Sequence, residues 1–170
     1  MFTKMKRIAR FEKVSKNQFS EAWVDTFKCD ENVYDEIKLP KRATQGSAGY
    51  DFFSTLDFSL APGESLKIPT GIRAYIEDGW VLKIYPRSGL GFKFRLQLNN
   101  TVGIIDSDYY NSDNEGHIFI KITNDSKEEK TVTIKKGEAF AQGIFLEYGV
   151  TYDDDVEEIR NGGFGSTSKK

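Results

Sequence analysis

Short strand-like segments, separated by turn residues at regular intervals, constrain the fold of this chain more than any other feature. The segments are rich in β-branched and aromatic residues, and Gly, Pro, Asn or Asp bounds most of them. Strands at roughly 8–12-residue spacing, with little helical periodicity, are typical of an all-β sandwich or barrel. The expected strands cover residues 6–14, 65–69, 71–76, 80–85, 117–123, 130–134 and 137–145.

One segment near the N-terminus departs from this pattern and has the period of a helix. Phe19, Trp23 and Phe27 recur every four residues, which places their rings on one face of a helix. Ser15 precedes them and has the right side chain for an N-cap. We therefore expect a short helical insertion over residues 15–35, with an aromatic stripe that packs against the domain rather than binding a ligand.

Length and charge exclude several classes of protein. The chain has 170 residues, enough for a single domain with a buried core, which we assign to residues 1–158. The net charge of -2 and the pI of about 5.6, with both signs interspersed, argue against nucleic-acid binding. No apolar run reaches about 18 residues, and the N-terminus lacks a signal-peptide core. We expect a cytoplasmic protein that binds neither nucleic acid nor membrane.

The single cysteine and the single histidine limit metal chemistry. Cys29 is alone, so the chain has no internal disulfide and no multi-cysteine metal site. His117 is also alone, which excludes a histidine-rich metal site. We expect this histidine to be a surface or strand residue rather than a ligand.

The C-terminal residues have a composition suited to a nucleoside polyphosphate. Phe164 lies between glycines, Ser166 and Thr167 follow it, and Arg160 precedes it. A stretch this rich in Gly, Ser and Lys predicts a flexible arm over residues 159–170. Its amides, hydroxyls and cations suit anionic oxygens, and its aromatic ring suits a base.

Two further clusters suit an anionic ligand. Residues 86–91 read Pro-Arg-Ser-Gly-Leu-Gly and directly follow an expected strand. Glycines there expose backbone N–H groups, and Arg87 and Ser88 are suited to phosphate oxygens, although the spacing is not that of a P-loop. Gln142 lies in an apolar strand and needs a hydrogen-bonding partner, either backbone or a bound ligand.

Two aspartates are candidates for catalysis or metal binding. Asp51 has apolar neighbours and is either a hydrogen-bonding anchor at a strand end or a carboxylate that holds metal-bound water. Asp106 directly follows residues 102–105, a Val-Gly-Ile-Ile run that we expect to be too apolar for an exposed surface. At that position Asp106 is either a partly desolvated base toward water or an ordinary turn residue.

Taken together, five ordered segments resemble the motifs of the trimeric dUTP pyrophosphatases, the dUTPases. They are Ala-Gly-Tyr-Asp at 48–51, Pro-Arg-Ser-Gly-Leu-Gly at 86–91, Asn-Thr-Val-Gly-Ile-Ile-Asp-Ser-Asp-Tyr at 100–109, Gly-Glu-Ala-Phe-Ala-Gln at 137–142 and Arg-Asn-Gly-Gly-Phe-Gly-Ser-Thr at 160–167. The resemblance implies a β-jelly-roll fold, also called a β-clip. It also implies a homotrimer with three active sites at subunit interfaces. In that family the C-terminal arm closes over a neighbouring subunit's site.

The resemblance also implies a role for each site residue. Asp106 would activate the water that attacks the α-phosphorus of dUTP, giving dUMP and pyrophosphate. Such an enzyme keeps uracil out of DNA and supplies dUMP for thymidylate synthesis. Mg²⁺ would bind the three phosphates, and Asp51 would reach the ion through water. The uracil and deoxyribose would contact Asn100, Gly103, Ile105, Tyr109 and Phe164, and the phosphates Arg87, Ser88, Gly89, Gln142, Arg160, Gly165, Ser166 and Thr167.

The chain departs from the family pattern in three places. Residues 110–115 lengthen the outgoing side of the uracil-binding hairpin, and they either displace that loop or project outward. Only Asn161 separates Arg160 from Gly162, one residue fewer than is usual. The helical segment over residues 15–35 is also extra.

Two other functions stay open. The first is a dCTP deaminase-like enzyme on the same fold, a relative that has a glutamate in the third motif and lacks the Gly-Phe-Gly arm. The second is a nucleotide-binding regulatory protein, whose protein partner would bind the extra segments. Asp106, Tyr109 and Phe164 favour the dUTPase over the deaminase, and the presence of every catalytic position argues against a purely regulatory role.

Overall fold

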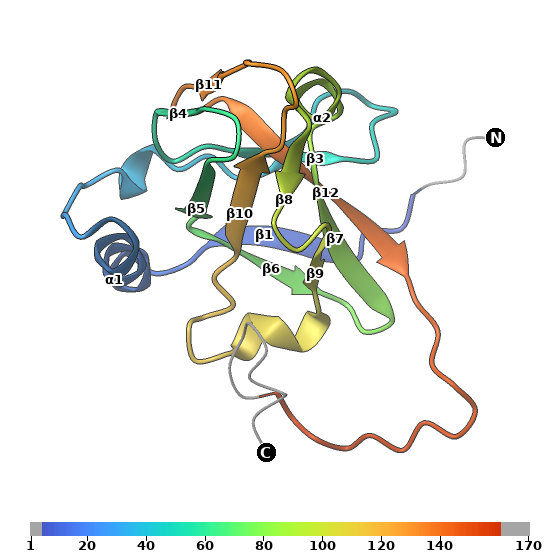
Figure 1. The fold of residues 1–170 in the computed structure, drawn as a ribbon. Coiled ribbons are helices and arrows are strands. Elements are labelled where there is room, and N and C mark those ends of the chain that lie inside the picture. The colour runs from blue at the N-terminus through green and yellow to red at the C-terminus, as the bar shows by residue number, and fades with distance from the viewer. Residues whose placement is uncertain (1–4, 161–170) are drawn as a thin grey trace.

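The structure is a computed structural model that describes residues 5–160. Within those residues the chain forms twelve strands and two α-helices, so the all-β expectation is confirmed (Figure 1). The elements are β1 (Ala9–Lys13), α1 (Lys16–Phe27), η1 (Tyr34–Glu36), β2 (Lys41–Arg42), β3 (Tyr50–Phe53), β4 (Phe58–Leu60), β5 (Ser65–Pro69), β6 (Ile72–Ile76), β7 (Trp80–Pro86), α2 (Ser88–Phe94), β8 (Leu96–Leu98), β9 (Gly103–Ile105), η2 (Ser107–Asn111), β10 (Phe119–Asn124), β11 (Val132–Ile134) and β12 (Ala139–Glu147).

The strands of the described residues pair in four small antiparallel sheets. The largest has the order β2-β3-β12-β7-β9, so the last strand of the chain lies in its centre and β9 lies at one edge. The others have the orders β5-β10-β8, β1-β6 and β11-β4. This arrangement places β9 beside β7, which separates it from β12.

The sheets enclose one main hydrophobic core. Its side chains alternate along the strands, and in β10 Ile120 and Ile122 are buried while Lys121 between them is exposed. Ile68, Leu82 and Phe140 reach this core from three other strands. Burial of one such side chain stabilises the folded state by about 1.5–3 kcal/mol.

The helical insertion expected over residues 15–35 is shorter in the structure, where α1 covers only Lys16–Phe27, and its aromatic stripe forms a second core. Ser15 is the N-cap of α1 and accepts a hydrogen bond from the backbone N–H of Gln18. Phe19 and Trp23 are almost fully buried, with 1% and 2% of their surface exposed, and pack with Val14 and Val33. The stripe is therefore packing, as the sequence predicts.

Several boundaries differ from the sequence expectations. Residues 86–91, for which the sequence analysis predicts no helix, lead into the short helix α2 at Ser88–Phe94. The strand expected from residue 117 begins at Phe119. His117 precedes that strand and is fully buried, so the expectation of a surface or strand histidine is wrong. Its ring lies 4.4 Å from that of Phe119 and 6.2 Å from that of Phe19, centroid to centroid, which explains the burial.

The chain after β12 leaves the sheet. Residues 148–160 have no helix or strand and run back toward η2, where Arg160 ends the described part (Figure 1). Among residues 5–160, no helix is long and apolar enough to cross a membrane.

Candidate active site

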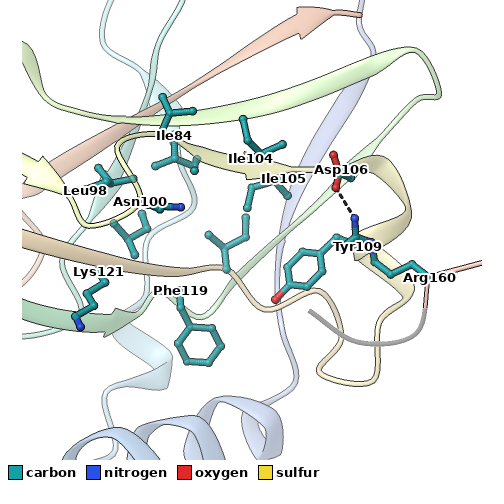
Figure 2. A pocket seen from close by; sticks show the side chains of 14 residues that line it. Ile84, Leu98, Asn100, Ile104, Ile105, Asp106, Tyr109, Phe119, Lys121 and Arg160 are labelled. Atoms are coloured by element: carbon teal, nitrogen blue, oxygen red, sulfur yellow. Dashed lines mark hydrogen bonds and ion pairs between the residues drawn. The ribbon is translucent and has the colours of Figure 1, made fainter. Parts of the chain in front are cut away.

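A pocket of about 250 Å³ opens where β9 meets the loop that follows it (Figure 2). Among residues 5–160, the backbone of β9 pairs only with β7, because β9 is the edge strand of its sheet. Its other backbone edge is therefore available to a ligand. The lining residues are Ile84, Leu98, Asn100, Val102, Gly103, Ile104, Ile105, Asp106, Tyr109, Ile118, Phe119, Ile120, Lys121 and Arg160.

The floor of this pocket requires a glycine where β9 crosses β7. A Cβ added at Gly103 would lie only 3.0 Å from Ile84 Cβ, so a larger residue would push the two strands apart. The neighbouring Ile104 is 50% exposed. The expectation that residues 102–105 are too apolar to be exposed is thus wrong for this residue, because successive side chains of a strand point to opposite faces.

Asp106 lies at one end of the pocket and interacts with Arg160. The Arg160 guanidinium forms an ion pair with the Asp106 carboxylate (Figure 2). It donates a second hydrogen bond, of 2.8 Å, from Nε to Asp108 Oδ1. About half of the Asp106 side chain, 46%, stays exposed, so it is accessible to water and substrate. The carboxylate is thus paired with a cation that the chain brings back after β12.

Tyr109 forms the wall of the pocket next to Asp106. Its hydroxyl donates a 2.6 Å hydrogen bond to the His117 carbonyl and accepts one of 2.8 Å from Asn114 Nδ2. The residue is 7% exposed. Burial raises the pKa of the Tyr109 phenol, while the Asn114 hydrogen bond and the Arg160 charge lower it to a smaller extent. The phenol therefore stays neutral at physiological pH.

His117, whose backbone carbonyl accepts the Tyr109 hydrogen bond, has its ring fixed by Gly71. Its Nε2 accepts a 2.9 Å hydrogen bond from the backbone N–H of Gly71, which assigns the proton to Nδ1. Burial lowers the pKa of His117 to about 4, opposed in part by the charge of Glu115. Protonation would turn the buried acceptor into a donor facing an N–H group, so the fold holds this histidine neutral.

The buried His117 predicts a loss of stability in mild acid. The unfolded chain takes up the proton near pH 6.5 and the folded chain only near about 4, so stability is full above the unfolded value and falls as the pH drops below it. At about 1.36 kcal/mol per pH unit, we expect the free energy of unfolding to fall by about 2 kcal/mol between about pH 7.5 and pH 5. Urea unfolding at each pH measures this. His117→Gln keeps an acceptor and should remove most of the slope, and an unchanged slope would contradict the assignment.

A second group of predicted residues lies on β3, β12 and the start of α2. Arg87 Nε lies 3.3 Å from Asp51 Oδ1, and Gln142 Nε2 donates a 3.1 Å hydrogen bond to the Pro86 carbonyl. Asp51 and Gln142 are opposite each other in the β3–β12 register. A Cβ at Gly49 would lie 2.5 Å from Gln142 Oε1, so this glycine admits the glutamine side chain. The partner that Gln142 needs is thus backbone in this chain.

The predicted site residues therefore fall into two groups. Asn100, Gly103, Ile105, Asp106, Tyr109 and Arg160 line the pocket, whereas Asp51, Arg87, Ser88, Gly89 and Gln142 do not. Ser88 and Gly89 are the first residues of α2. Phe164, Gly165, Ser166 and Thr167 lie outside the described residues.

Sequence reasoning missed several residues that complete the pocket. Phe119 and Lys121 on β10 line it, and Asn114 holds Tyr109. Alternating apolar and polar residues predict that residues 119–124 form a strand. They do not indicate which other segment lies across the pocket from it. The Asn114 contact depends on the path of a loop, which local sequence does not encode.

The donor set near Asp51 fits a hydrated magnesium ion bound mainly by its ligand. Among residues 5–160 there is no cluster of three or more His, Cys, Asp or Glu side chains suited to hold a metal. Asp51 offers one carboxylate, with 18% of its side chain exposed. Mg²⁺ often keeps several waters and takes few protein ligands when substrate phosphates bind it, so a single carboxylate is compatible with this ion.

Known proteins resemble this chain along most of its length. The dUTPase family model matches residues 35–168. The deoxyuridine 5'-triphosphate nucleotidohydrolase of Lactococcus lactis subsp. lactis is 49% identical over 134 residues, which cover 77% of this chain and 88% of the relative. That of Tolumonas auensis is 40% identical over 148 residues, covering 82% and 93%.

Solved structures agree. The dUTPase of Streptococcus mutans aligns with a TM-score of 0.60 and 33% identity over 83% of this chain and 97% of that one. The dUTPase of Staphylococcus bacteriophage 80alpha with dUPNHPP aligns with a TM-score of 0.62 and 26% identity, over 95% and 98%.

The shared fold and these relatives place the chain in a class of enzymes that hydrolyse nucleotides. The family model covers well over half of the sequence. The alignments with the two relatives, at 49% and 40% identity, cover most of the length of each relative. Within that class, this chain belongs to the dUTPase family.

Proposed function

We propose that this protein hydrolyses dUTP to dUMP and pyrophosphate. The observation that carries the proposal is the pocket itself, where a free strand edge, a buried tyrosine and an accessible carboxylate meet in one cavity. A nucleoside fits such a site because the strand edge suits a base and the ring suits a sugar. Family membership supplies the substrate, since the curated relatives are named deoxyuridine 5'-triphosphate nucleotidohydrolases.

In this proposal β9 recognises uracil through its unpaired backbone edge, together with the Asn100 side chain. Fixed donors and acceptors discriminate by pairing, because cytosine would present an amino group where uracil presents a carbonyl. Ile105 and the backbone at Gly103 contribute apolar contact and close approach. Tyr109 packs against the deoxyribose and leaves no space for a 2′-hydroxyl.

Asp106 is the proposed general base. Its carboxylate accepts a proton from a water molecule, whose oxygen then attacks the α-phosphorus. The bond between the α-phosphorus and the bridging oxygen breaks, and pyrophosphate leaves with the electron pair. Arg160 is already beside Asp106, so it is placed to exchange from the carboxylate to the phosphates when substrate enters.

The phosphate site is proposed to combine residues of several subunits. Arg87 and Gln142 carry suitable donors, yet neither lines the pocket of the same chain that contains Asp106. A homotrimer with sites at its interfaces would bring such separated groups together, and residues 161–167 of the arm would add further phosphate contacts. Mg²⁺ on the phosphates, with Asp51 reached through water, would spread their negative charge.

A substrate panel tests the proposal. We expect pyrophosphate release from dUTP with Mg²⁺ and loss of release when EDTA removes the metal. We expect at least about a hundredfold lower kcat/KM for dCTP, because the cytosine amino group misfits the polar edge. We also expect lower values for dTTP and UTP, because the thymine methyl and the ribose 2′-hydroxyl need space that the pocket does not offer. A coupled pyrophosphate assay measures all four. Ammonia release from dCTP would instead identify the deaminase, and nucleotide binding without turnover would favour the regulatory protein.

A further inference from the structure

Residues 110–115, which lengthen the hairpin after Tyr109, fold inward against the back of the site. η2 ends at Asn111, and the turn that follows returns the chain to Tyr109. Asn114 Nδ2 donates to the Tyr109 hydroxyl at 2.8 Å, while Asn114 Oδ1 accepts from the Gly116 N–H at 3.2 Å. Part of the segment therefore packs back onto the pocket wall, while Asn111 and Asp113 stay exposed. One of its side chains holds the wall of the pocket.

The segment is also anchored to the N-terminal part of the chain. Glu115 accepts hydrogen bonds from the Ser15 N–H at 2.7 Å and the Ser15 hydroxyl at 2.6 Å. The Tyr110 hydroxyl donates to Glu12 at 2.7 Å, and Arg73 donates to the Tyr110 carbonyl at 2.7 Å. These contacts fix both ends of the turn, so Asn114 is presented from a rigid support.

The chemistry of the phenol makes the Asn114 contact directional. A phenol carries one proton, and Tyr109 uses it to donate to the His117 carbonyl. Only a donor can satisfy the remaining lone pairs, and the Asn114 amide is that donor. Because Tyr109 is 7% exposed, water replaces this bond poorly. Two hydrogen bonds of opposite direction thus fix the outer end of the ring.

If the Tyr109 ring is held in place, it excludes a ligand with a larger sugar, whereas a Tyr109 ring that can move admits such a ligand. We propose that Asn114 is a positioning residue that fixes Tyr109 and thereby sets the selectivity of the pocket for 2′-deoxyribose over ribose. This inference rests on the proposed function for its substrate. It assigns the extra hairpin residues a role inside the active site rather than on a partner surface.

Asn114→Asp tests the inference because it keeps the acceptor for Gly116 N–H and replaces the donor to Tyr109 with an acceptor. We expect the ratio of kcat/KM for dUTP to that for UTP to fall about five- to tenfold, as for one lost buried hydrogen bond, mainly through a rise in kcat/KM for UTP. Asn111→Asp makes the same chemical change on an exposed side chain of this segment. That control should keep the wild-type ratio.

A double-mutant cycle separates positioning from general structure. Tyr109→Phe has no hydroxyl, so adding Asn114→Asp to it should change the ratio by less than about twofold. Two results would overturn the inference. One is a dUTP-to-UTP ratio of kcat/KM in Asn114→Asp equal to that of Asn111→Asp. The other is an equal loss of this ratio with Tyr109 and with Tyr109→Phe.

A measurement without substrate distinguishes failure of this inference from failure of the proposed function. In ¹³C-tyrosine NMR of the free protein, Asn114→Asp should raise the pKa of the Tyr109 phenol, because a donor is lost and a negative charge added. An unchanged pKa of the Tyr109 phenol would overturn the positioning role. Absence of dUTP hydrolysis by the unmodified protein would instead overturn the proposed function and, with it, the sugar selectivity.

Discussion

Replacing Asp106 with Asn should lower kcat for dUTP hydrolysis by about 10²- to 10⁴-fold, the usual range for loss of a general base. Asn has the shape of Asp but cannot take up the proton of water. The pocket would keep its other lining residues, so KM should change by less than about threefold. Pre-steady-state hydrolysis and equilibrium binding of dUTP measure the two effects separately.

The ion pair with Arg160 requires a matched control for this experiment. Asp108 also accepts a hydrogen bond from Arg160, yet it does not line the pocket. Asp108→Asn therefore removes a carboxylate near Arg160 without removing the proposed base, and we expect it to retain activity within about tenfold, as for a partly exposed ion pair. A variant at position 106 that loses dUTP binding but keeps turnover would refute the assigned role.

Ending the chain at Ile159 should lower kcat/KM by about a hundredfold or more, the scale observed when a donor to a developing charge is removed. The truncation removes Arg160, which lines the pocket, together with Phe164, Ser166 and Thr167. An arm that closes over the substrate would also exclude water. Hydrolysis at a range of dUTP concentrations gives the rate, and size-exclusion chromatography with light scattering checks that the assembly is unchanged.

Arg160→Ala divides this effect between the arginine and the residues after it. If Arg160 acts on the phosphates, the single substitution should reproduce part of the loss. The truncated chain also leaves Asp106 without its ion pair, so a rise in activity would mean that Arg160 restrains the carboxylate. Activity equal to that of the complete chain would disprove the proposed closing arm.

Local patterns in the sequence predict most of the strands and the N-terminal helix. Turn residues bound β5 as expected, and the spacing of Phe19 and Trp23 locates α1 because both rings face one core. Propensity fails where packing decides. Glycines at 89 and 91 indicate a loop, yet the chain forms α2. Histidine is a residue type expected at the surface, but the rings of Phe19 and Phe119 pack against His117.

The candidate site is predictable only in part for a related reason. The motifs identify Asp106 and Tyr109, and the structure places both in one pocket. The roles assigned to individual residues stay predictions until the variants are measured. Contacts such as Asn114 to Tyr109 and Ser15 to Glu115 join segments through the path of loops. Such contacts follow from the three-dimensional fold and leave no periodic signal in the sequence.

The central position of β12 has a consequence for biosynthesis. β12 is the last strand of the described chain, and it lies between β3 and β7 in the sheet that carries β9. While a ribosome is still adding residues 139–147, this sheet lacks its middle, and β3 and β7 have no shared neighbour. Pairings between distant segments form late and slowly. Until residues 139–147 have been made, β2 and β3 therefore cannot join β7 and β9 in one sheet.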